Sequence, residues 1–89
     1  MNQAIVDPEQ LRRFAANLRI FSEELQQRAT ALSSQMNQLE QTWRDQQQQK
    51  FADEFSEQLR QLNRLVASTR EHVPYLLKKA EQAEQYLRG

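Results

Sequence analysis

The chain has 89 residues, 12 acidic and 12 basic side chains, and no cysteine. This length allows one domain at most, and a single glycine with two prolines is too little for the tight turns of a β-protein. The zero net charge argues against general attraction to nucleic acid or to an anionic membrane, and the missing thiols exclude disulfides. Composition therefore predicts an all-α protein that does not bind nucleic acid.

The first predicted helix has a clear beginning. Asp7 suits the N-cap, and Pro8 follows at the first helical position, where its missing N–H is harmless. From Leu11 to Trp43, apolar residues recur every three or four positions and so lie on one side of a helix. The pattern predicts a helix over about residues 8–43. The core and dimer stripe of this helix is expected to include Leu18, Phe21, Leu25, Leu32 and Leu39.

The stretch from Arg44 to Lys50 contains no apolar residue, and the stripe returns afterwards in a shifted phase. A continuous helix through this stretch is one reading, because no glycine or proline marks a turn there. A single long helix would, however, expose its whole apolar strip to water. We therefore predict an antiparallel helical hairpin that reverses over about residues 44–48.

The second predicted helix covers about residues 49–87 of the same single domain, 1–89. Pro74 lies inside it and should cause a kink, since proline removes a backbone hydrogen bond while the apolar spacing continues beyond it. The core and dimer stripe of this helix is expected to include Phe55, Leu59, Leu62 and Val66.

The apolar stripes are wider than one helix–helix seam requires. Ile20 stands next to Phe21, and Leu65 stands next to Val66, so each helix has a second apolar edge. A two-helix chain of this size buries little apolar area by itself. We expect a partner chain, either a second copy that completes an antiparallel four-helix bundle or a different chain with a matching stripe.

The sequence resembles the WXG family, the helical-hairpin substrates of type VII (ESX-type) secretion systems. The matching features are the length, the capped start at Asp7, Trp43 near the middle of the chain, and Phe51 eight residues later. Two features differ. Asp45 stands where the family's Trp-x-Gly turn has glycine. The family's Tyr-x-x-x-Asp/Glu export motif is absent, because the residue four positions after Tyr75 is Lys79.

The resemblance implies a protein secreted without a cleavable N-terminal signal, which acts by protein contacts as a homodimer or with a paralogous WXG-like chain. A secretion ATPase or a toxin effector would then be a further partner. Trp43, Asp45 and Phe51 are the expected turn and recognition residues, and Tyr86 marks a candidate C-terminal export segment. The main alternative is a cytoplasmic structural coiled coil or adaptor that is not exported.

Catalytic chemistry is not expected. The only histidine, His72, has Glu71 beside it, but adjacent helical residues point in different directions and cannot serve one site. The sequence contains no Glu-x-x-His pair for a metal centre and no glycine-rich phosphate loop. We predict a protein without cofactor or metal that is neither an enzyme nor inserted in a membrane.

Overall fold

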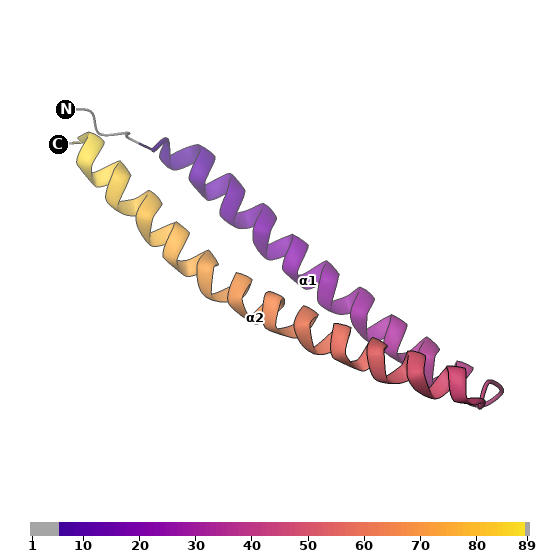
Figure 1. The fold of residues 1–89 in the computed structure, drawn as a ribbon. Helices are drawn as coiled ribbons and strands as arrows, with labels where there is room; N and C mark the ends of the chain where they lie inside the picture. The colour runs from indigo at the N-terminus through magenta and orange to yellow at the C-terminus, as the bar shows by residue number, and fades with distance from the viewer. Residues whose placement is uncertain (1–5, 89) are drawn as a thin grey trace. The chain divides into compact units, whose positions relative to one another are not determined.

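The computed structural model describes residues 6–88 and contains two long helices, α1 (Pro8–Leu39) and α2 (Gln46–Arg88), joined by a turn (Figure 1). The prediction of an all-α helical hairpin is confirmed. A continuous helix through the polar stretch is thereby excluded. Assembly of two such hairpins into a four-helix bundle stays a prediction.

Helix α1 begins as the sequence predicts. The Oδ1 atom of Asp7 accepts a hydrogen bond from the backbone N–H of Glu9 at 2.9 Å, and the Asp7 carbonyl accepts one from the N–H of Leu11 at 3.1 Å. The first bond satisfies a donor that a helix start leaves without an intrahelical partner, and the second is the first bond of the helical ladder. Asp7 is thus the N-cap of α1, with Pro8 as the first helical residue.

The other helix ends differ from the expected positions by a few residues. Helix α1 ends at Leu39, short of position 43, and α2 starts at Gln46, before position 49. Helix α2 continues through Pro74 to Arg88 although proline has no N–H to donate. A kink at Pro74 stays a prediction.

The internal contacts divide the chain into two units. In the first unit, the part of α1 up to Ser22 packs with the part of α2 from Ser68 onward. The second unit, Glu23–Ala67, holds the rest of both helices and the turn. Each unit is therefore a pair of antiparallel helical segments.

The buried seam consists of small side chains in the first unit, whereas the second unit also buries Met36 and Gln48. Ala15 and Ala80 are 0% exposed in the first unit, and Ala29 and Val66 are buried in the second. Small residues let two helix backbones approach closely, and most of the larger apolar side chains lie on the flanks or outside. Within the expected stripe, Val66 is buried; Leu18, Leu25, Phe55, Leu59 and Leu62 are half-buried; and Phe21, Leu32 and Leu39 are exposed.

Ser22 belongs to this seam and is 1% exposed, yet its hydroxyl has no hydrogen-bond partner among the described residues. We expect Ser22→Ala to stabilise the chain by about 1–2 kcal/mol, because it removes a desolvated hydroxyl without a partner and introduces a better helix former. Thermal melting followed by circular dichroism measures the change. Ser34→Ala, at an exposed position, gains only the better helix propensity. An equal rise of the melting temperature in both variants would therefore contradict a cost of the buried Ser22 hydroxyl.

Candidate functional site

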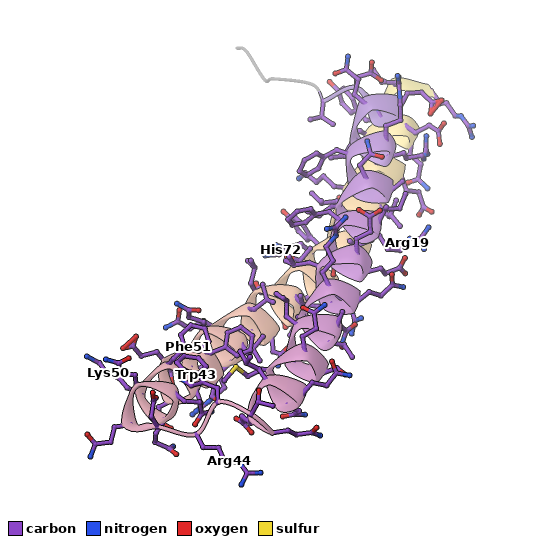
Figure 2. The ribbon with its side chains drawn as sticks, turned by 90° about the vertical axis from the view of Figure 1, so that its right-hand side faces the viewer. Arg19, Trp43, Arg44, Lys50, Phe51 and His72 are labelled. Carbon is purple, nitrogen blue, oxygen red and sulfur yellow. The ribbon has the colours of Figure 1, made fainter. Side chains whose placement is uncertain are left out.

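Three aromatic rings form a cluster beside the turn, which we call the aromatic tip: Trp43, Phe51 and Phe55. The ring centroids of Trp43 and Phe51 lie 6.0 Å apart at an interplanar angle of 33°, and those of Phe51 and Phe55 lie 5.8 Å apart at 13°. Both distances are within the range of favourable aromatic contacts. Figure 2 shows Trp43 next to Phe51, whereas Arg44 and Lys50 point away from the cluster. The predicted recognition residues Trp43 and Phe51 therefore come together.

The end of α1 holds Trp43 in place. The backbone N–H of Trp43 donates to the carbonyl of Leu39 at 2.9 Å, and the N–H of Thr42 donates to the same carbonyl at 3.1 Å. The Nε atom of Arg44 donates to the carbonyl of Glu40 at 3.3 Å. These bonds satisfy carbonyls that the last helical turn would leave unpaired. The turn is thus fixed by its own backbone groups and by the Arg44 side chain, although it contains no glycine.

Asp45 is the N-cap of α2. Its Oδ1 atom accepts a hydrogen bond from the N–H of Gln48 at 2.9 Å, and its carbonyl accepts one from the N–H of Gln49 at 3.3 Å. Aspartate is among the best N-cap residues, and its charge is favourable at a helix N-terminus. Asp45 therefore has a structural function at the position where the Trp-x-Gly pattern has glycine.

An apolar groove of about 180 Å³ adjoins the aromatic tip and is lined by both helices. Leu39 and Phe51, both 44% exposed, form part of its wall. A second, more polar hollow of about 170 Å³ shares Met36 and Phe55 with the groove. The tip thus offers an open apolar surface, which suits protein contacts, while Met36 in the lining is itself buried. The groove-lining residues are Leu32, Gln35, Met36, Leu39, Phe51 and Phe55.

In the first unit, an ion pair joins the two helices. The Arg12 guanidinium donates to the carboxylate of Glu84 at 2.6 Å, and Arg88 lies 4.0 Å from the other carboxylate oxygen. The hydrogen bond from Arg12, its positive charge and that of Arg88 lower the pKa of Glu84 below its ordinary 4.5. The bond to Glu84 likewise raises the pKa of Arg12 above its ordinary value. Both groups are therefore charged at neutral pH.

This pair should make the stability of the first unit depend on acid pH. Because the pKa of Glu84 is lowered on folding, the pair stabilises fully above pH 4.5, and the effect is lost as the pH falls through the lowered pKa. Arg12 stays charged throughout this range. We expect the melting temperature of Glu84→Gln to be lower than that of the wild type at neutral pH and equal to it in strong acid. Glu54→Gln, at an exposed position, serves as the control, and its difference in melting temperature from the wild type should not depend on pH in this way. If the melting temperatures of Glu84→Gln and the wild type differed by the same amount at every pH, the ion pair would not contribute to stability.

The remaining expected site residue, Tyr86, lies in the first unit on α2 and is 68% exposed. The structure does not group it with Trp43, Asp45 and Phe51, which belong to the second unit. Among residues 6–88, no cluster of three or more His, Cys, Asp or Glu could hold a metal ion. Neither described helix is both long and apolar enough for a membrane span.

The sequence did not point to the groove or to the pairing of Arg12 with Glu84. Met36 is one of the periodic apolar positions and Gln35 is not, but the period does not show which residues of the two helices line a common groove. Arg12 and Glu84 stand 72 positions apart, so no local spacing connects them. A signal for Asp45 was present, because an aspartate three residues before a glutamine is a capping pattern.

One comparison with known proteins, the comparison with family profiles, gives a match, and it agrees with the helical hairpin. Comparison with curated proteins and with solved structures gives no match. The profile of the WXG100 family, described as proteins of 100 residues with WXG, matches residues 3–86. Members of this family are small, non-enzymatic helical proteins that type VII systems secrete without a signal peptide and that typically form dimers. The chain belongs to the WXG100 family of ESX (type VII) secretion substrates.

Proposed function

We propose that this protein is secreted through a type VII system and acts by protein–protein contacts as a helical-hairpin dimer, without catalytic activity of its own. The dimer partner is a second copy or a paralogous WXG-like chain. The aromatic tip is the surface that a secretion ATPase or a toxin effector contacts. Family membership supports the secretion context.

The observation that carries the dimer is the exposure of large apolar side chains on α1. Phe14 is 56% exposed and Phe21 is 53% exposed, although alanine at the neighbouring seam position 15 is fully buried. Contiguous exposed apolar side chains on a small protein mark interaction surfaces. When a partner covers these side chains, their apolar area is removed from water, which stabilises the complex by roughly 25 cal/mol per Å² of buried area.

Sedimentation equilibrium at micromolar concentration tests the dimer. We expect the wild type to sediment as a dimer and Phe21→Lys to sediment as a monomer with nearly unchanged helical content, because the charge falls on the contact surface and not in the seam. Gln27→Lys, which adds the same charge at an exposed polar position, should remain dimeric. A wild-type chain that stays monomeric alone and with every co-expressed WXG-like chain would contradict the proposal.

The absence of Tyr-x-x-x-Asp/Glu supports a second candidate, a cytoplasmic adaptor that uses the same surfaces. Fractionation of a host that carries a type VII system separates the two functions. Protein in the culture medium that disappears when the secretion ATPase is deleted supports export. Protein found only in the cytosol supports the adaptor.

A further inference from the structure

The last part of α2 carries a surface of aromatic and basic side chains, which we call the Tyr–Lys surface. Tyr75, Lys78, Lys79 and Gln82 line a shallow hollow of about 200 Å³ on this helix. Tyr75 is 61% exposed, and Tyr86, placed further along the helix, is also largely exposed. Neither lysine lies on the buried seam that holds Ala80.

The charges of this segment are separated between two sides of α2. Glu84 is hydrogen-bonded to Arg12 of α1, and Glu81 lies close enough to Arg12 to contribute to its raised pKa. The Glu84 carboxylate is therefore directed toward α1. Among residues 6–88, no carboxylate forms an ion pair with Lys78 or Lys79, so the Tyr–Lys surface has a local positive charge on a chain that is neutral as a whole.

All four groups in the hollow can donate hydrogen bonds: the tyrosine hydroxyl, the two ammonium groups and the glutamine amide. Carboxylates are the complementary acceptors, and hydrogen bonds to ionised groups are the stronger ones. Tyr75, Lys79, Gln82 and Tyr86 recur every three or four residues, which aligns them along one helix face. A partner helix with glutamates at the same spacing would match this row of donors.

We propose that the Tyr–Lys surface binds an acidic helix of a partner protein. The occupant presents carboxylates every three or four residues, packs aliphatic stems against the exposed Tyr75 ring and forms charge-assisted hydrogen bonds with Lys78 and Lys79. The surface is formed by α2 of one chain, so the inference goes beyond the proposed dimer and secretion and does not depend on either.

The experiment uses the full chain and a fluorescent, alanine-based helical peptide with a glutamate at every fourth position. Fluorescence anisotropy at low salt measures the dissociation constant, and amide shifts of the isotope-labelled chain locate the peptide. We expect shifts centred on Tyr75 to Gln82. Binding should weaken at least tenfold in the double variant Lys78→Gln, Lys79→Gln, and binding of the matched peptide with glutamine in place of glutamate should be lost.

Lys50 is the one lysine in the sequence besides Lys78 and Lys79; it is exposed near the turn and provides the matched control. Lys50→Gln should leave the affinity within twofold of the wild type. An equal loss in Lys50→Gln, or binding of the glutamine peptide, would overturn the proposal in favour of general charge attraction or apolar contact. Lysine-dependent binding to inorganic phosphate or to vesicles with one third anionic lipid, tighter than to the peptide, would overturn it in favour of a different anion.

Discussion

Ala15→Lys is expected to unfold the first unit, whereas Ala16→Lys, the same change one position later, should leave it folded. Ala15 is 0% exposed and faces the seam, but Ala16 is exposed to solvent. A lysine at position 15 must push the helices apart and bury its ammonium group, at a cost of about 3 kcal/mol or more. A loss of this size is a large fraction of the stability of a small domain.

Thermal melting followed by circular dichroism measures both variants. The pair is closely matched, because residue type, added charge and helix-propensity change are identical at the two positions. We expect Ala15→Lys to lose cooperative melting and Ala16→Lys to melt within a few degrees of the wild type. Similar melting of the two variants would show that the seam does not hold the helices together.

Trp43→Ala should abolish export of the protein while the hairpin stays folded. Trp43 is half-buried and its ring contacts that of Phe51 in a tilted arrangement, so truncation removes a ring contact worth about 0.5–1.5 kcal/mol together with some apolar burial. This loss should lower the melting temperature moderately without unfolding the chain. Removing the ring also removes one of the three rings that form the aromatic tip. The measurements are the amount of protein in the culture medium and the melting temperature.

Two controls distinguish recognition from stability in this experiment. Trp43→Phe keeps a ring on Phe51 and should retain a substantial part of export. Ala29→Gly, a buried seam substitution, costs about 1 kcal/mol in a helix interior but leaves the aromatic tip unchanged, so it should be exported normally. Loss of export in Ala29→Gly would mean that stability, and not Trp43 itself, determines secretion.

The apolar period identified the hairpin but only part of its seam: Val66 and Ala29 lie at periodic positions and are buried. The sequence pattern places Phe21 in the core stripe, but Ser22, its neighbour, is the buried residue. Alanine and serine contribute little to a hydrophobicity pattern, although they allow the closest helix contact. Large residues dominate the pattern and lie on the flanks, where a partner could cover them. The seam therefore depends on tertiary contacts that one-dimensional spacing does not contain.

The turn shows which local signals were sufficient. The stretch without apolar residues after Trp43 correctly indicates a reversal, because an amphipathic helix needs its apolar side to continue. The pairing of Trp43 with Phe51 was expected only through the family resemblance. The end of α1 at Leu39 had no sequence marker, because the residues after it are compatible with a helix and become a turn through hydrogen bonds back to Leu39 and Glu40.

The placement of the chromophores gives each unit its own optical reporter. The single tryptophan lies in the second unit against Phe51, and both tyrosines, Tyr75 and Tyr86, lie in the first. Tryptophan emission therefore follows the turn region, while the tyrosine signal follows the segment around the Arg12–Glu84 pair, and no label has to be introduced. Coincident transitions of the two signals would show that the units unfold cooperatively, and separate transitions would give the order in which they open.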